Sequence, residues 1–251
     1  MSSPLHTGFM KFNNIAAYKF VELSQLDSLK QALLEKCRAL AIKGTVLLSP
    51  EGINLMLSAP LAAIEAIKQQ LSAIPQFSDL IYKESLSERC AFKRLFIKIK
   101  PEIITLRDAN INLTQPTTGK YLSPSEFKQW LDAKKDMLIL DTRNAFEMEY
   151  GTFENAVNLN LQRFTQFPEA IEQQLDSSAK EKPVVMFCTG GIRCEKASAV
   201  MLNQGYKQVY QLEGGILNYF QHCGGAHYQG DCFVFDERVA LDSNLTPIVK
   251  T

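Results

Sequence analysis

Four short apolar segments in the second half of the chain limit the folds that it can adopt. They read MLILD, AVNLN, PVVMFC and QVYQL, at residues 137–141, 156–160, 183–188 and 208–212, and helical stretches separate them. Strands that are apolar on both faces are typical of parallel sheets, because helices cover such sheets on each side. Strands that alternate with helices have the order that this arrangement requires. The second half therefore predicts an α/β domain with a parallel sheet covered by helices on both faces.

The first hundred residues carry a different order of elements. Apolar residues recur at helical spacing over 27–42 and 60–74. Strand patterns occupy 15–23, 44–49, 53–58, 77–85 and 94–100, and the turn PEG at 50–52 joins two of them as a hairpin. The order β-α-β-β-α-β is typical of a ferredoxin-like or acylphosphatase-like α+β domain. A decorated α+β domain of unrelated topology is the alternative.

A polar segment separates the two patterns. NLTQPTTGKY, at 112–121, contains Pro116 and Gly119 and shows no strand or helix periodicity. In the next segment Ser123 caps a helix, Pro124 takes its first position and Glu126 closes a capping box. We therefore predict an N-terminal domain over 1–111, a linker over 112–120, an α/β domain over 121–222 and a C-terminal extension over 223–251.

Charge and cysteine usage exclude several classes of protein. Lys and Arg together number 27, and so do Asp and Glu, so no global charge favours nucleic acid, although a local patch can still bind it. No apolar run approaches the ~20 residues that span a bilayer, and the first residues lack the apolar core of a signal peptide. The six cysteines are scattered through a large chain, which predicts reduced thiols in a cytoplasmic protein that does not contact membranes.

The segment CTGGIRC, at 188–194, is the strongest candidate for chemistry. Cys188 ends an apolar strand, and the carboxyl ends of parallel strands are where open α/β sheets bind ligands. Gly190 and Gly191 allow a tight turn into a helix, whose first N–H groups are unpaired and favour a negative charge. A cysteine in such a cradle has a lowered pKa and reacts as a thiolate. The alternative is a small buried apolar residue.

Two further residues of this loop bear on its chemistry. Arg193 supplies a permanent positive charge or grips an anionic substrate, and Cys194 either resolves an oxidised Cys188 or only packs. A cysteine phosphatase surrounds its phosphate with Cys-x5-Arg, whereas this chain has Cys-x4-Arg. The shorter loop favours a single small adduct on the thiol over a phosphate. The predicted active-site loop comprises Cys188 as the catalytic residue with Thr189, Gly190, Gly191, Ile192, Arg193 and Cys194.

The motifs of the second half resemble those of the rhodanese family. LDTRNAFEMEYGTFENAVNLN, CTGGIRCEKA and GYKQVYQLEGGILNY are similar to successive rhodanese motifs over about 121–222. KGTVLLSPEGIN at 43–54 and GDCFVFDERVALD at 230–242 resemble the flanks of one subfamily, the rhodanese-domain tRNA uridine hydroxylases. Longer members carry paired cysteines beyond the second flank. The residues after 242 in this sequence contain no cysteine, so we expect no zinc module there.

This resemblance implies a function. Members of the subfamily convert the wobble uridine of tRNA to 5-hydroxyuridine with dioxygen as co-substrate. The resemblance therefore implies neither a metal nor a flavin as cofactor. Cys188 matches the catalytic cysteine and Cys194 the second loop cysteine. We predict tRNA as the partner and no obligatory protein partner. A sulfurtransferase that carries a persulfide on Cys188 is the alternative, and a non-enzymatic binding module is the third reading.

Two groups of residues are candidates for supporting roles. Asp141 and Arg143 follow the first strand of the α/β domain, where they brace the active-site region, and Glu147 has a structural role. In the basic stretch 83–100, strand alternation places Arg94, Phe96, Lys98 and Lys100 on one face. This pattern fits either contact with RNA or an ordinary solvated sheet edge. The family resemblance favours RNA contact over the alternative for Lys93, Arg94, Lys98 and Lys100.

The segment HCGGAHYQGDC, at 222–232, raises the question of a metal. It contains His222, Cys223, His227 and Cys232, but none of the spacings matches a compact pair such as Cys-x2-Cys. We therefore predict no metal site. His6 lies near the start of the chain and receives no role.

Overall fold

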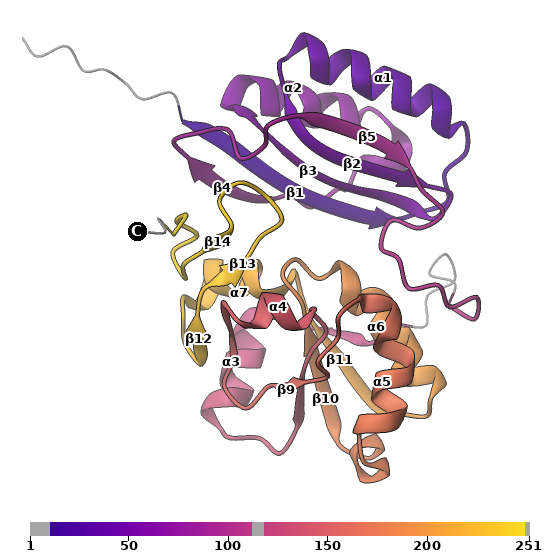
Figure 1. Ribbon diagram of the computed structural model, residues 1–251, viewed down its shortest axis with the longest axis vertical. Coiled ribbons are helices and arrows are strands. Elements are labelled where there is room, and N and C mark those ends of the chain that lie inside the picture. The colour runs from indigo at the N-terminus through magenta and orange to yellow at the C-terminus, as the bar shows by residue number, and fades with distance from the viewer. Residues whose placement is uncertain (1–10, 112–117, 249–251) are drawn as a thin grey trace, which may run out of the picture.

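The N-terminal domain is a five-stranded sheet with two helices on one face (Figure 1). The computed structural model describes residues 11–111 and 118–248, so His6 and most of the predicted linker lie outside the described residues. The strand order is β4-β1-β3-β2-β5, and only β2 and β5 pair in parallel. The elements are β1 (Phe12–Phe20), α1 (Leu26–Ala39), β2 (Lys43–Ser49), β3 (Gly52–Pro60), α2 (Leu61–Ser72), a 3-10 turn (Pro75–Phe77), β4 (Lys83–Ser87) and β5 (Leu95–Ile99).

This topology confirms the predicted ferredoxin-like class, with differences at the ends of strands. The hairpin at 50–52 joins β2 to β3 as predicted. The predicted strand over 77–85 is wrong in its first half, because the chain forms a 3-10 turn at Pro75–Phe77 and β4 begins only at Lys83. Pro75 fixes its own φ and starts this turn, which local apolar character did not reveal.

The two faces of this sheet have different surroundings. Ile15 and Ala17 of β1 belong to the buried core beneath the helices, together with Leu33 of α1 and Ile64 of α2. Because neighbouring residues of a strand point to opposite faces, the alternate residues of β1 lie on the other side. We call that side the open face. It carries a cross-strand row that runs Lys83, Ala16, Met56, Thr45, Phe96 and a second row that runs Tyr18, Asn54, Leu47, Lys98.

The second domain confirms the predicted α/β class. Its sheet has the order β6-β11-β10-β7-β9, and every neighbouring pair is parallel. The strands are β6 (Lys120–Leu122), β7 (Leu138–Asp141), β9 (Val157–Asn158), β10 (Pro183–Phe187) and β11 (Gln208–Leu212). The helices are α3 (Pro124–Asp132), α4 (Ala145–Met148), α5 (Phe167–Gln174), α6 (Ile192–Asn203) and α7 (Gly215–Cys223), with 3-10 turns at Phe164–Gln166 and Ser177–Lys180.

Helices cover both faces of this parallel sheet. Val184 and Met186 of β10 pack in one core with Ile171 of α5 and Val200 of α6. Val185 and Phe187 point the other way, into the core that contains α3 and α7. The predicted capping box starts α3, since the Ser123 hydroxyl accepts a hydrogen bond from the Glu126 amide at 3.3 Å. β10 is therefore the buried central strand, and it fixes the position of the residues that follow Phe187.

The C-terminal extension returns to the N-terminal domain. β12 (Tyr228–Gly230) pairs with β8 (Gly151–Phe153), and β13 (Cys232–Phe233) pairs with β14 (Ala240–Leu241). The Glu237 amide then donates a hydrogen bond to the Ala91 carbonyl at 2.9 Å, and the Arg238 guanidinium donates one to the Ser85 hydroxyl at 2.6 Å. The extension lies between the two domains and contacts both, as Figure 1 shows in yellow.

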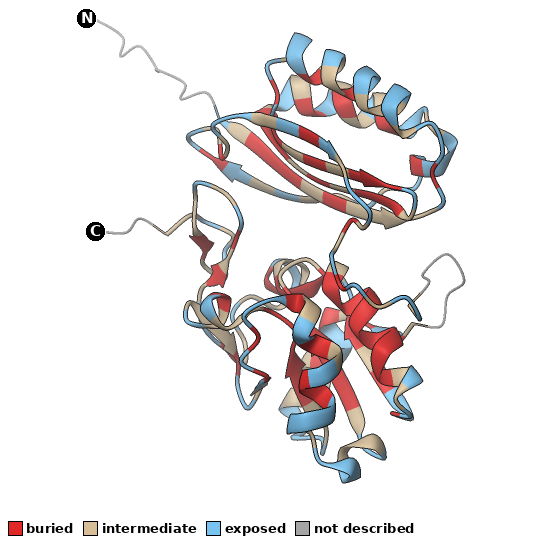
Figure 2. Ribbon diagram, turned by 45° about the vertical axis from the view of Figure 1, so that its right-hand side comes forward, coloured by how far each residue is buried: buried red, intermediate tan, exposed pale blue. Residues whose placement is uncertain are grey.

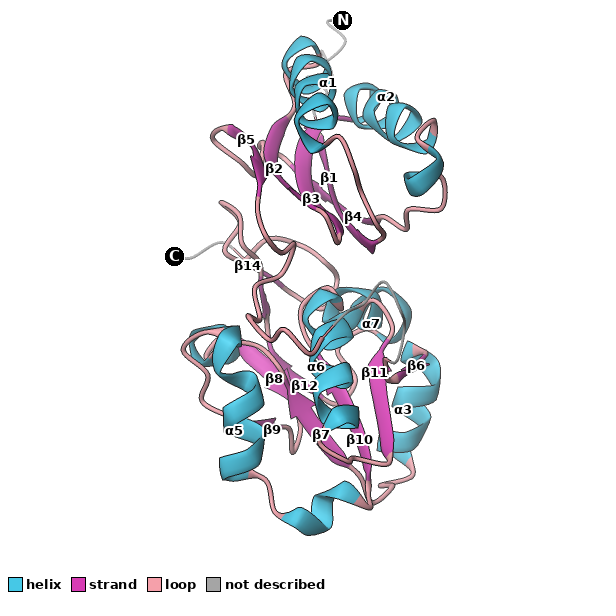
Figure 3. Ribbon diagram, turned by 90° about the vertical axis from the view of Figure 1, so that its right-hand side faces the viewer, coloured by secondary structure: helices cyan, strands magenta, loops and turns pink. Residues whose placement is uncertain are grey.

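The open face of the N-terminal sheet is turned towards the second domain. Figures 1 and 3 agree that α1 and α2 cover the opposite face of that sheet. α6 is consequently buried along almost its whole length, as Figure 2 shows, because one side packs on the parallel sheet and another approaches the N-terminal domain. In the described parts of the chain, no helix combines the length and the apolar character needed to cross a bilayer.

Candidate active site

Cys188 lies directly after β10, at the carboxyl end of the central strand, and only 1% of its surface is exposed. The Gly191 amide donates a hydrogen bond to its sulfur at 3.1 Å. Gly191 has φ 97°, a backbone conformation in which other residues are strained, and it immediately precedes α6. The amide cradle expected from the sequence is therefore present, and it depends on a glycine at this position.

A second glycine packs the backbone of the loop. The Ile216 amide donates to the Cys188 carbonyl at 3.0 Å. A Cβ atom on Gly215 would lie 2.4 Å from that same carbonyl oxygen, which is closer than any side chain can approach. The start of α7 is thus held against the loop, and the position of Cys188 is fixed from both sides.

The electrostatic surroundings favour a thiolate at Cys188. Burial alone would raise the pKa of the Cys188 thiol. The Cys194 thiol, the charge of Arg193 and the amides of Arg193 and Gly191 outweigh burial and lower that pKa. Burial raises the pKa of Cys194, and the hydrogen bond to Cys188 and its charge raise it further. The loop therefore holds one reactive thiolate beside one neutral thiol, and the thiolate is the nucleophilic form.

Arg193 does not point a free guanidinium at a substrate. Its Nη1 and Nη2 donate to the two carboxylate oxygens of Glu147 at 2.6 and 2.7 Å, and both side chains are buried. The expectation that Arg193 grips an anionic substrate stays a prediction, and in this structure the two terminal nitrogens each donate to Glu147. Its positive charge acts on Cys188. Glu147 has the structural role that was expected of it.

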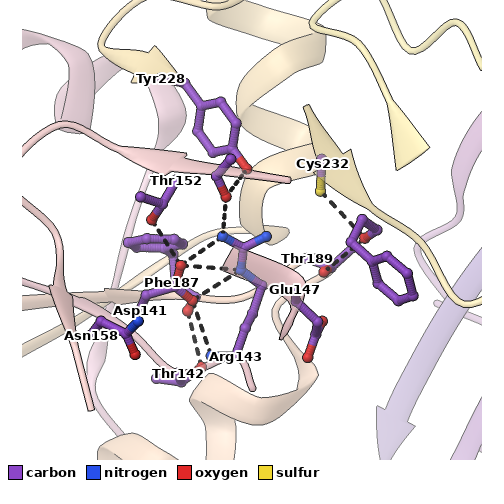
Figure 4. A network of polar contacts seen from close by, with 12 residues as sticks. Asp141, Thr142, Arg143, Glu147, Thr152, Asn158, Phe187, Thr189, Tyr228 and Cys232 are labelled. Carbon is purple, nitrogen blue, oxygen red and sulfur yellow. Dashed lines mark hydrogen bonds and ion pairs between the residues drawn. The ribbon is translucent and has the colours of Figure 1, made fainter. Parts of the chain in front are cut away.

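Asp141 and Arg143 form a second buried pair behind the loop (Figure 4). Arg143 donates to Asp141 through Nε at 2.9 Å and through Nη2 at 2.6 Å, and Nη2 also reaches the Gly151 carbonyl. The Thr152 hydroxyl donates to Asp141 at 2.9 Å. These contacts tie β7 to β8, so the pair braces the site without reaching into it. Thr142 completes the link, because its hydroxyl donates to the Phe187 carbonyl at 2.9 Å.

The loop faces a cavity of about 290 Å³ between the two domains. Cys188, Thr189 and Gly190 line one side, and the open face of the N-terminal sheet lines the other. Phe235 and Arg238 of the C-terminal extension close a third side. This volume is close to the lower end of the range for small-molecule sites, about 300–1,000 Å³. Cys188 therefore opens onto a space that neither domain forms alone.

Tyr18 joins the open face to the loop. Its hydroxyl donates to Glu195 of α6 at 2.9 Å, and Tyr121 donates to the same carboxylate oxygen at 2.9 Å. Burial raises the pKa of Tyr18, and the charges of Glu195 and Cys188 raise it further, so the hydroxyl stays protonated as a donor. A Cβ on Gly191 would lie 2.9 Å from the Tyr18 oxygen. The two domains meet closely at the cradle itself.

An ion-pair cluster also holds the domains together. Lys196 of α6 lies 2.9 Å from Glu51 and 2.7 Å from Glu102, both of which belong to the N-terminal domain. Its side chain is only 3% exposed. Because a buried ammonium requires such partners, these contacts fix how the open face is presented to the loop.

Lys83 is the cation nearest the loop from the N-terminal side. It lines the cavity, and its Cδ lies 3.9 Å from the place where a Cβ on Gly190 would be. Its ammonium is 5.0 Å from the centre of the Tyr18 ring. Burial lowers the pKa of Lys83, although the charges of Cys188, Glu195 and Glu213 oppose this effect. Sequence reasoning placed Lys83 only in a general basic stretch and missed Tyr18 altogether.

The predicted RNA-contact residues lie around β5, at the edge of the sheet. Arg94, Lys98 and Lys100 are exposed, and Phe96 is 44% exposed with the Lys98 ammonium 4.9 Å from its ring centre. Phe96 and Lys98 share the open face with the cavity-lining residues. Lys93 instead forms an exposed ion pair with Glu237 at 3.0 Å.

Three of the four residues that raised the question of a metal, His222, His227 and Cys232, have separate partners. His227 pairs with Asp132 at 2.7 Å, and His222 lies 2.9 Å from the Asn218 carbonyl. Cys232 is buried near Thr189, where burial raises the pKa of its thiol to about 12. Within residues 11–111 and 118–248, no three His, Cys, Asp or Glu side chains are grouped so that they could hold a metal ion.

Comparison with known proteins identifies the family. Residues 12–103 match the family model described as the UPF0176 acylphosphatase like domain, and residues 123–222 match the Rhodanese-like domain. A protein of Cupriavidus necator named tRNA uridine(34) hydroxylase is 49% identical over 245 residues, which cover 95% of this chain and 86% of that protein. The chain belongs to the tRNA uridine(34) hydroxylase family. The resemblance indicated by the sequence motifs is thereby confirmed.

Other members of the tRNA uridine(34) hydroxylase family are equally similar. The protein of that name from Bordetella petrii is 49% identical over 241 residues, covering 93% of this chain and 94% of its own. The one from Ralstonia nicotianae is 49% identical over 245 residues, covering 95% and 86%. The similarity spans both domains and the extension, and thus all three sides of the cavity.

Proposed function

We propose that this protein hydroxylates uridine 34 of tRNA, the wobble position, at C5 of the base, with dioxygen as the oxidant. One oxygen atom enters at C5, and the other leaves as water with two electrons and two protons from a reductant. The single observation that carries the proposal is the placement of the Cys188 thiolate at the floor of a cavity walled by both domains. A carrier of one sulfur atom has no need of the second wall.

The cavity suits one nucleobase rather than a long segment of RNA. Enzymes that act on a base move it out of its stack into a pocket, and an anticodon loop presents unpaired bases for which this costs little. The lining is largely apolar and includes Leu217 and Phe235. A flat, weakly hydrated pyrimidine ring fits such a lining.

RNA reaches this cavity along the open face in our proposal. The exposed Phe96 offers a surface on which an unpaired base stacks, and Arg94, Lys98 and Lys100 surround it with positive charge for phosphates. Since these residues share a sheet face with the cavity wall, one strand of RNA contacts both. We place the reaction in the cytoplasm, where tRNA and reduced thiols are present. No metal or flavin takes part.

The test is nucleoside mass spectrometry of tRNA from cells that lack this protein and any redundant pathway. Restoring the wild-type protein should return 5-hydroxyuridine and its derivatives, whereas Cys188→Ser should not. Persistence of the modified nucleoside with Cys188→Ser contradicts the role of the thiol. Unchanged tRNA in the deletion strain, together with strong thiosulfate-to-cyanide transfer by the purified protein, favours the sulfurtransferase instead.

A further inference from the structure

Lys83 is a half-buried cation without a direct ion-pair partner, although the charges of Cys188, Glu195 and Glu213 act on it from further away. In the part of the chain that the structure describes, no carboxylate lies within ion-pair distance of its ammonium and no acceptor forms a hydrogen bond with it. Neighbouring Lys68, by contrast, pairs with Glu84 and Glu65. Removing a charge from water without a partner costs stability, so an unpaired lysine is retained at that cost.

The position of Lys83 relates it to the catalytic loop. It begins β4, opposite Ala16 of β1, and its side chain leaves the open face towards Gly190. Tyr18 lies beside it, with the ammonium 5.0 Å from the ring, and its phenol is already committed to Glu195. The ammonium is therefore a polar group of the N-terminal wall that is free to meet a ligand held over Cys188.

We propose that Lys83 is a catalytic residue that binds the C4 carbonyl oxygen of the target uracil while the Cys188 thiolate adds to C6. This inference rests on the proposed function. In the addition the sulfur forms a bond to C6, the C5–C6 π pair moves to C4–C5, and the carbonyl pair moves onto O4. Lys83 donates a proton to that oxygen. The product is an enol whose C5 is nucleophilic, which is the atom that must react with dioxygen.

Physical reasons favour this role for a lysine in this place. Negative charge develops on O4 only as the thiolate adds, so a fixed cation there stabilises the transition state more than the ground state. The largely apolar cavity strengthens the interaction, because few water molecules compete. Burial lowers the pKa of Lys83, which makes its ammonium a better proton donor.

The experiment separates this step from the reaction with dioxygen. A tRNA transcript with deuterium at C5 of uridine 34 is incubated anaerobically with the protein, and loss of deuterium is followed by mass spectrometry. Reversible addition of Cys188 to C6 exchanges the C5 hydrogen with solvent. The wild-type protein should exchange it, Cys188→Ser should not, and Lys83→Met should be slower by about 10²-fold, as for the loss of one oxyanion donor.

Steady-state kinetics and stability complete the test. Lys83→Met should lower kcat for 5-hydroxyuridine formation about 10²-fold with little change in KM, and its Tm should equal or exceed that of the wild type. Lys182→Met is the matched control, because Lys182 is an exposed lysine before the opposite end of β10 and pairs with Asp136. It should keep the wild-type kcat.

Several results would overturn the assignment. A higher KM with unchanged kcat in Lys83→Met would make Lys83 a phosphate contact, and a lower Tm would make it a structural residue. If Lys83→Met has wild-type rates and the wild-type protein is active, Lys83 has no catalytic role, while the proposed function stands. A wild-type protein that forms no 5-hydroxyuridine in air would contradict both the role of Lys83 and the proposed function.

Discussion

The two facing walls of the cavity are built in opposite ways. The rhodanese wall is formed mainly by one loop, within Cys188 to Arg193, with Leu217 and Gln221 of α7 beside it. Most interactions of this wall with the sulfur come from backbone amides and near neighbours. The N-terminal wall consists of side chains from separate strands, such as Tyr18 and Lys83, which the sheet brings together. A wall made of backbone is set by the local fold of one loop. A wall made of side chains varies one residue at a time and depends on how the domains dock.

The loop wall depends most on the buried pair beneath it, and we expect Glu147→Ala to have the largest effect. It leaves the Arg193 guanidinium buried without its carboxylate partner. Breaking a buried ion pair in this way costs about 3–5 kcal/mol. The free energy of unfolding in urea should fall by that amount, and activity should be lost. Asp132→Ala is the control, because it removes only the ion pairs of an exposed carboxylate. An equal loss of unfolding free energy in that variant would contradict the special role of the buried pair.

The point of contact between the walls is tested by Gly191→Ala. The new Cβ would lie 2.9 Å from the Tyr18 hydroxyl in a residue with φ 97°. Gly205→Ala is a matched control, because its φ is 90° and nothing lies within 4 Å of the Cβ. Both variants should lose about 1–2 kcal/mol from backbone strain. Only Gly191→Ala should also lose activity, by roughly 10²-fold, because the sulfur and the N-terminal wall are displaced.

Equal activities in those two glycine variants would show that the walls meet less closely than the structure indicates. Activity is measured as 5-hydroxyuridine formed per enzyme, and strain as the change in the free energy of unfolding. The control therefore separates the conformational cost, which both glycines share, from the contact between domains, which only Gly191 makes.

The smallest effect concerns the pH dependence of the loop thiols. Because the folded loop lowers the pKa of Cys188, the fraction of thiolate should reach one half below the ordinary value of about 8.5. Alkylation by iodoacetamide, followed by mass spectrometry, should give that midpoint for Cys188 and leave Cys194 unmodified at neutral pH, since the pKa of Cys194 is raised. A midpoint at or above 8.5 for Cys188 would contradict the cradle.

The same shift has a defined sign in stability. A group that is more acidic in the folded state stabilises that state above its unfolded pKa. The contribution of Cys188 should therefore be present at alkaline pH and be lost as the pH falls through the lowered pKa. The difference between the wild type and Cys188→Ser across this range measures it.

The loop wall could be predicted from the sequence because its determinants are local. An apolar strand, two glycines and a helix start fix the surroundings of Cys188 within a few residues. The partner of Arg193 could not be predicted in the same way, since Glu147 approaches from a separate helix. Alternation in β1 indicates that Asn14, Ala16 and Tyr18 share a face, but no local pattern says that another domain will lie opposite.

The fold itself followed from periodicity, with errors where a proline changed the chain direction. Apolar runs identified β7, β10 and β11 because buried strands need no polar face. The segment at 77–85 is apolar enough for a strand, but the turn at Pro75–Phe77 delays β4 until Lys83. The pairing of β8 with β12 joins residues far apart in the chain and left no signal in either segment.

The C-terminal extension gives the cavity an order of assembly. Val234, Phe235 and Arg238 line it, and they follow both domains in the chain, so a ribosome adds them after both domains. Domains generally fold as units from the N-terminus during synthesis. Both domains can therefore be complete on a nascent chain while one side of the cavity is still missing. The sulfur acquires its full enclosure only when the extension has been added, so a polypeptide that stops short of the extension cannot present a finished site to tRNA.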